Sequence, residues 1–209
     1  MNALAAFDTA FIANALDRPR SAVTHYELHS FAYLACLLSV YSGIPANDWG
    51  YEFASVPPAQ PYAHAIADAA SGLVRTGVLD RVNSTMSITD AGAETLSAWA
   101  GMHYFADRRR FLVGATGAAL VLPGATVVNS LGLDPQLSRA QELGDSRVLF
   151  DDVLAHRLYQ DLAALKEAVP AEAKDLMVPA VLYLQYLIGE AREAYLPHAF
   201  DITGPNDNG

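Results

Sequence analysis

The sequence predicts a mainly α-helical protein that contains one small β-hairpin. Apolar residues recur at helical spacing in long runs, such as residues 26–42 and 148–168. Residues 78–88 instead hold two short hydrophobic strands around the polar turn Asn-Ser-Thr at 83–85. Hydrophobic residues make up 52% of the 209-residue chain and charged residues 17%. This balance excludes a disordered or fibrous protein and suffices for a sizeable core.

The charge balance argues against a broad nucleic-acid-binding face. Thirteen basic residues stand against twenty-three acidic ones, and the formal net charge is −10. A surface that tracks phosphates needs clustered Lys and Arg, because counterion release drives that binding. The single cysteine, Cys36, lies in the apolar run FAYLACLL and is expected to be a buried small hydrophobe in a reducing compartment. No signal peptide is evident, so we expect a cytoplasmic protein.

The first predicted helix covers residues 2–16, where Leu4, Phe7, Phe11, Ile12 and Leu16 lie near one face. Asp17, Pro19 and Ser21 are expected to end it. We interpret residues 1–23 as an N-terminal docking arm that packs on its own domain or on a partner.

The second predicted helix, residues 26–42, is apolar on most of its surface. Thr24 and Glu27 have the spacing of a capping box, and Gly43 closes the helix. The following segment, PANDWGYEFASVPPAQP, is a turn-rich connection that has room for one short helix around residues 49–54.

The third predicted helix, residues 62–75, ends at the signal Gly77. A strand at 78–82, a tight turn at 83–85 and a returning strand at 86–88 follow it. Thr89 or Asp90 then caps a helix that runs to about residue 100.

This segment, GLVRTGVLDRVNSTMSITDAGAETLSAWA, resembles the recognition helix, wing and following helix of winged helix-turn-helix domains. The matching positions are Leu73, Gly77, Val78, Leu79, Met86, Ile88, Thr89, Gly92 and Leu96. The resemblance covers about residues 24–100. It implies a winged-helix domain with a small β-hairpin wing, followed by a helical half at 101–200.

Many members of this superfamily regulate transcription by binding DNA, yet few side chains here suit that role. Readers of the major groove project Arg, Lys, Asn or Gln from the recognition helix. The candidate DNA contacts are His64, Ser71, Arg75, Thr76, Arg81 and Asn83. The acid Asp68 lies among them, and the wing tip itself has no Lys or Arg. We therefore expect a winged helix that contacts protein, with a DNA-binding transcriptional regulator as the alternative.

A second, less specific resemblance concerns the size, the acidity and the apolar character of the whole chain. A small winged-helix half joined to a helical half is similar to the middle, accessory subunits that accompany ABC- or SMC-like ATPases in bacterial defence operons of the Lamassu type. The apolar opening YELHSFAYLACLL is part of this likeness. The resemblance implies a non-enzymatic subunit of a multicomponent antiviral complex, in a homo- or hetero-oligomer.

The second half is predicted to be helical. Residues 103–122 read as a helix that Pro123 and Gly124 break, and residues 125–137 as either a strand and loop or a short helix. Further predicted helices are residues 137–143, 148–168 and 174–195, in the last of which Pro179 marks a kink or the true start. The polar tail, residues 201–209, is expected to be flexible.

Residues 111–133 carry no charge and follow three arginines, a pattern that also occurs beside membrane spans. Interruptions such as Gly114, Gly117 and Pro123 favour a buried helix, a turn and a second element, and we expect no membrane contact. A ligand or membrane role for this run stays open.

No motif for catalysis, a cofactor or a metal is convincing. VGATGA at 113–118 resembles a dinucleotide-binding glycine loop, but Leu120 occupies the third glycine position and no strand precedes it. We therefore expect glycines that pack closely on a neighbour. His25 and His29 would share a helix face, but no acid or cysteine cluster complements them.

Arg108, Arg109 and Arg110 form the strongest basic cluster. They are candidates for contact with an anion or an acidic partner, and only two of them can share one face. A solvated turn of helix ahead of a buried segment is the favoured interpretation. Asp151 and Asp152 need no catalytic role, because acids favour a helix N-terminus.

Overall fold

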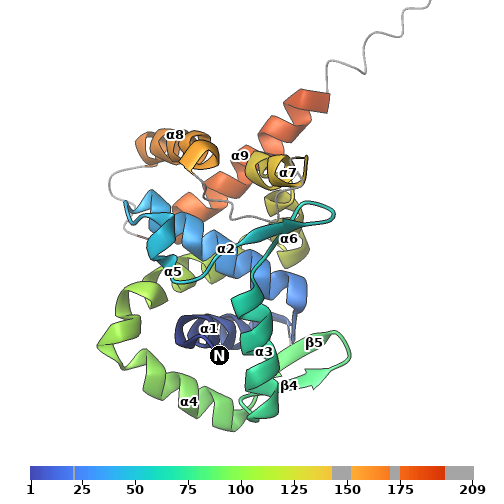
Figure 1. The fold of residues 1–209 in the computed structure, drawn as a ribbon, viewed down its shortest axis with the longest axis vertical. Helices are drawn as coiled ribbons and strands as arrows, with labels where there is room; N and C mark the ends of the chain where they lie inside the picture. Colours follow the sequence, from blue (N-terminus) through green and yellow to red (C-terminus); the bar gives the residue numbers. More distant parts are fainter. Residues whose placement is uncertain (21, 143–151, 170–174, 196–209) are drawn as a thin grey trace, which may run out of the picture.

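The computed structural model describes residues 1–20, 22–142, 152–169 and 175–195 (Figure 1). It is 72% helical and 9% strand, which confirms the predicted mainly α-helical class. The predicted tail, residues 201–209, lies outside the described residues, as do residues 148–151 of the predicted helix and Asp151.

The first half follows the predicted order with one addition. Its elements are α1 (Ala3–Arg20), β1 (Val23–Thr24), α2 (His25–Tyr41), the 3-10 helix η1 (Ala46–Trp49), β2 (Ala54–Val56), β3 (Gln60–Tyr62), α3 (His64–Arg75), β4 (Leu79–Val82), β5 (Thr85–Ile88) and α4 (Asp90–Ala100). Helix α1 continues past Asp17 to Arg20, so the predicted end was too early.

The predicted cap of α2 is present. The Thr24 side chain accepts the Glu27 N–H at 3.2 Å, and Glu27 Oε2 accepts the Thr24 N–H at 2.8 Å. Two donors that the first turn would otherwise leave unpaired are thereby satisfied. Gly43, at a φ of +92°, follows the helix in the left-handed conformation that suits glycine.

Three of the strands form one antiparallel sheet in the order β1-β5-β4. Strand β1 lies between α1 and α2 in the chain and pairs Val23 with Met86 of β5. The β4–β5 hairpin turns at Asn83, whose φ is +57°. As predicted, Gly77 follows α3, at a φ of +75°, and Thr89 caps α4 by accepting the Gly92 N–H at 2.9 Å.

The hairpin β2–β3 was not predicted. Strand β2 pairs with β3 in the register Ser55 to Pro61, within the segment that the sequence indicated as a turn-rich connection. The short helix that does form, η1, ends at Trp49, where the predicted one began. Proline at 57, 58 and 61 concealed this pairing, because proline usually argues against a strand.

The second half consists of η2 (His103–Phe105), α5 (Ala106–Gly117), η3 (Ala118–Leu120), α6 (Gly124–Leu131), α7 (Pro135–Glu142), α8 (Asp152–Ala168) and α9 (Met177–Tyr195). The helix predicted for 103–122 is thus one α-helix between two 3-10 turns. Of the two structures predicted for residues 125–137, the short helix is the one that forms, at residues 124–131. Helix α9 starts two residues before Pro179, which therefore lies in its first turn.

Helix α2 runs through the middle of the molecule, with α1 on one side and α8 and α9 on the other, and it also packs against α5 and α6 (Figure 1). Its residues 28–40 are all buried. Helix α1 contributes Phe7, Ile12 and Leu16 to the same core and contacts α3 and α4. The boundaries at 23/24 and 100/101 stay predictions.

Among the described residues, no single helix is long and apolar enough to cross a membrane. The pair formed by His103–Leu120 and Gly124–Leu131 passes the test of length and composition together, and is bent by 115°.

Candidate functional surfaces

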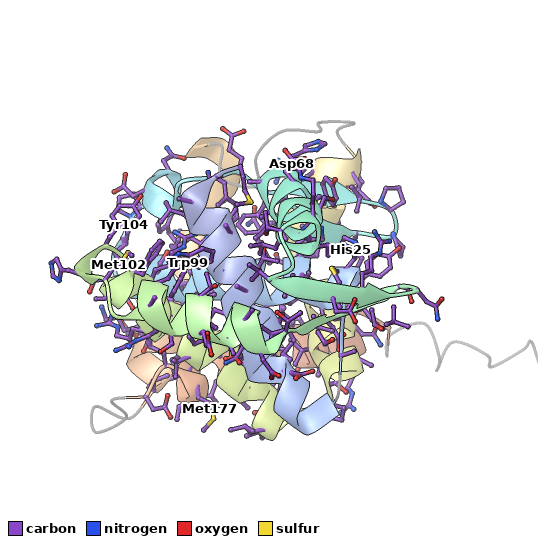
Figure 2. All side chains as sticks on the ribbon, turned by 90° about the horizontal axis from the view of Figure 1, so that it is seen from below. His25, Asp68, Trp99, Met102, Tyr104 and Met177 are labelled. Carbon is purple, nitrogen blue, oxygen red and sulfur yellow. The ribbon has the colours of Figure 1, made fainter. Side chains whose placement is uncertain are left out.

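The six candidate DNA contacts lie on α3, on the residue that follows it, and on the β4–β5 hairpin, which lies beside α3 (Figure 1). All six side chains are exposed: His64, Ser71, Arg75, Thr76, Arg81 and Asn83. The exposed acids on the same two elements are Asp68 and Asp80. Asp68 points outward from α3 (Figure 2). Arg75 and Arg81 are thus accompanied by an equal number of carboxylates, a balance that opposes phosphate binding.

Arg81 is also partly engaged within its own hairpin. Its Nε donates to the Asn83 carbonyl oxygen at 3.2 Å, and its backbone N–H donates to Asp80 Oδ1 at 2.8 Å. A guanidinium held against its own turn, beside a carboxylate, is poorly placed to reach a phosphate group.

The three consecutive arginines differ in exposure, and Arg108 is not available for the contact with an anion or acidic partner that its cluster predicted. Arg108 is only 8% exposed, whereas Arg109 and Arg110 are exposed. Arg109 donates to the Ala100 carbonyl oxygen at 3.4 Å, and Arg110 donates to the Ser42 hydroxyl at 3.3 Å. A contact of Arg109 and Arg110 with an anion or an acidic partner stays a prediction.

Arg108 instead forms a buried ion pair with Asp8 of α1. Its Nε and Nη2 donate to the two Asp8 oxygens, each at 2.6 Å, and its Nη1 donates to the Trp49 carbonyl oxygen at 2.6 Å. The guanidinium carbon lies 3.7 Å from the centre of the Trp49 ring. Tyr51 donates its hydroxyl to Asp8 as well. These contacts join α1, α5 and the η1 segment.

Burial raises the pKa of the Asp8 carboxyl, and the adjacent Arg108 guanidinium opposes that rise. We treat the pair as ionised, because bidentate Arg–carboxylate geometry with further donors satisfies both charges. One feature of the sequence indicates that Asp8 is buried. Asp8 is four residues from both Leu4 and Ile12, so it lies on the apolar face of α1.

Exposed apolar side chains gather where α4 ends. Met102 is 50% exposed and Tyr104 66%, and both lie near Trp99 (Figure 2). Phe105 anchors this segment to the core, because its ring is buried and stacks on Phe7 with ring centres 4.2 Å apart. Tyr104 packs edge-on against Phe105. These three residues, Trp99, Met102 and Tyr104, are called the α4-end patch below.

Of the two histidines that would share a helix face, His29 is already engaged by the backbone. His29 is buried, and its Nδ1 accepts the Ala63 N–H at 3.1 Å, so one ring nitrogen is already used. Burial and the neighbouring His25 and His64 lower the pKa of His29 to about 4. No group of three or more metal-ligating side chains occurs in the described part of the chain.

A second buried carboxylate lies in the helical half. Asp134, which is fully buried, accepts the Tyr33 hydroxyl at 2.8 Å, the Tyr183 hydroxyl at 3.3 Å and the Gln136 N–H at 2.9 Å. Burial raises the pKa of Asp134. The sequence did not reveal this group, because its partners lie on α2 and α9, far away in the chain.

The glycines of VGATGA lie within α5 and allow close packing, as predicted. A Cβ on Gly114 would come within 2.5 Å of Leu176 Cβ and 3.1 Å of Leu38 Cδ1. A Cβ on Gly117 would lie 3.3 Å from Met177. Because Gly114 and Gly117 have no side chain, the start of α9 can pack closely against α5.

Comparison of the chain with protein-family models, with curated proteins and with solved structures gave no match.

Proposed function

We propose that this protein is a non-enzymatic subunit that uses a winged-helix framework to contact another protein. The framework is supported by the order of elements α1, β1, α2, α3, β4, β5 and α4, and by the sheet order β1-β5-β4. In this arrangement α3 takes the place of the recognition helix and the β4–β5 hairpin that of the wing.

The α4-end patch carries the proposal for protein contact. Large apolar side chains are exposed there on a segment that Phe105 fixes in place, so little conformational entropy is lost on binding. Aromatic residues and methionine are enriched in interfaces. The exposed acids Asp68 and Asp80, on α3 and the hairpin, support the same interpretation.

The kind of partner follows from the resemblance to accessory subunits of ATPase-based defence systems. We propose a cytoplasmic assembly with an ATPase encoded by a neighbouring gene, in which this chain supplies binding surface and no catalytic group. The same patch is also available for pairing with a second copy.

The test combines co-expression with light scattering. The protein with Met102→Glu and Tyr104→Glu is compared with the unchanged protein for its oligomeric mass and for its association with the products of adjacent genes. Loss of association in this variant, with retention in Val82→Glu, supports the proposal, since Val82 is 60% exposed on the hairpin. A monomer that binds none of these proteins before any substitution contradicts it.

A DNA-binding regulator remains the second candidate, because the six candidate DNA contacts are all exposed. Binding of DNA from upstream of its own gene should then weaken steeply as salt rises. Arg75→Ala should reduce the salt dependence by about one phosphate contact, and Arg81→Ala by less, since Arg81 is engaged within its hairpin. Absence of binding at low ionic strength removes this candidate.

A further inference from the structure

A pocket of about 550 Å³ lies between α8 and α9. Five of its lining residues carry the argument: Asp161 and Leu165 of α8, and Leu182, Tyr183 and Tyr186 of α9. A mainly apolar pocket with a few converging polar groups is the usual form of a small-molecule site.

The lining combines aromatic rings with a carboxylate. The rings of Tyr183 and Tyr186 lie 6.4 Å apart, tilted by 34°. Asp161 lies on the facing helix, and the pocket has no Lys, Arg or His among its described lining residues. Aromatic faces attract cations, and most strongly when the cation is partly removed from water.

A second carboxyl group lies directly behind this lining. The Tyr183 hydroxyl donates to the buried Asp134, so one wall of the pocket is hydrogen-bonded to a carboxylate. The three hydrogen bonds that Asp134 accepts come from neutral donors, Tyr33, Tyr183 and the Gln136 amide. Burial is the main cause that raises the pKa of Asp134, and the Asp161 charge raises it further. A cation beside Asp161 would offset the Asp161 charge that acts on Asp134.

We propose that the α8–α9 pocket binds an organic ammonium ion that carries a short apolar chain. The positive group is recognised by Asp161 and the tyrosine rings, and the apolar chain by Leu165 and Leu182. Asp161 and Tyr186 also interact within their own chain, so the ligand adds to those contacts. Anions are disfavoured by the two carboxylates. This site is independent of the α4-end patch and of the proposed protein partner.

Isothermal titration calorimetry with three probes of equal chain length tests the proposal. The probes are hexyltrimethylammonium, hexanol and hexanoate. We expect binding of the ammonium probe and no measurable binding of hexanoate. Hexanol should bind at least tenfold more weakly than the ammonium, since a partly desolvated cation–π contact contributes about that factor.

Variants then assign the binding to named side chains. Asp161→Asn keeps the size and removes the charge, and Tyr186→Leu removes a ring that is partly exposed. Each should weaken binding of the ammonium about tenfold. Glu167→Gln is the matched control, because it removes an exposed acid from the same helix outside the pocket lining and should leave binding unchanged. Circular dichroism confirms that each variant is folded.

Three results would overturn the proposal. They are the absence of binding by the ammonium probe, equal binding of hexanol and the ammonium, and an unchanged affinity in folded Asp161→Asn. The second result would show an apolar pocket with no preference for cations.

Discussion

Arg108 and Asp8 show how one residue pair can hold three separate segments together. Removal of Arg108 by substitution with methionine leaves the Asp8 carboxylate buried without a counter-charge. We expect Arg108→Met to lower the free energy of unfolding by about 3–5 kcal/mol, as is usual for a broken buried pair. Urea denaturation measures this loss. Arg109→Met, on the exposed neighbouring position, should change stability by less than about 1 kcal/mol.

A double substitution separates the value of the pair from the penalty of an unpaired charge. Asp8→Leu combined with Arg108→Met removes both charges from the core. Its stability should exceed that of Arg108→Met alone, because no buried ion is left without a partner. A double variant that is no more stable than the single one would show that Trp49 packing, rather than charge, dominates this site.

His29 makes stability depend on pH in the acidic range. Its pKa is about 4 in the folded protein because the ring is buried, whereas an unperturbed histidine titrates at about 6.5. The folded state therefore binds fewer protons between these values, so stability is lost as pH falls from about 6.5 towards 4. We expect His29 to lower the free energy of unfolding by about 2 kcal/mol when the pH falls from about 7.5 to about 5.

Comparison with His29→Asn isolates this effect from other titrating groups, such as Asp134. Asparagine retains an acceptor for the Ala63 N–H and does not titrate. The midpoints of urea denaturation of the unchanged protein and of His29→Asn, each measured at the two pH values given above, show how much of the pH dependence His29 causes. Equal pH dependence in the two proteins would assign the acid sensitivity to residues other than His29.

Among the secondary-structure elements, those with strong local signals could be predicted from the sequence. The Thr24–Glu27 cap, the turn at Asn83 and the Thr89 cap lie within a few residues of what they organise, so local spacing is sufficient. The β2–β3 hairpin could not be predicted, because short strands rich in proline gain their stability from the core beneath them. The 3-10 turns beside α5 were missed for a similar reason.

Gly92 controls how the hairpin meets α4. A Cβ at this position would collide with the Val78 carbonyl oxygen, although the residue is helical and alanine has the higher helix propensity. We expect Gly92→Ala to destabilise the protein by about 1–3 kcal/mol through overpacking. Gly189→Ala is the matched control on α9, where a Cβ would meet nothing within 4 Å. The control should raise stability by up to about 1 kcal/mol.

The candidate sites were less predictable than the fold at the level of the whole molecule. The exposed positions on α3 and the hairpin followed from local spacing. The burial of Arg108 did not, because its partner Asp8 is 100 residues away in the chain. The same holds for Asp134, whose partners Tyr33 and Tyr183 come from α2 and α9. Pairing over such separations depends on tertiary packing, which periodicity does not reveal.

These long-range contacts predict how the whole chain unfolds. Helix α2 belongs to the predicted domain 24–100 and contacts α5, α6 and α8 of the helical half. Arg108 and Asp134 of that half bond to Trp49 and Tyr33 across the same boundary. We therefore expect one cooperative transition in urea. Emission of Trp99, followed in Trp49→Phe, reports on α4 in the first half, while far-UV circular dichroism reports on helices of both halves. The two midpoints should coincide. An earlier transition in one signal would show that residues 24–100 and 101–200 unfold separately, despite the contacts across α2.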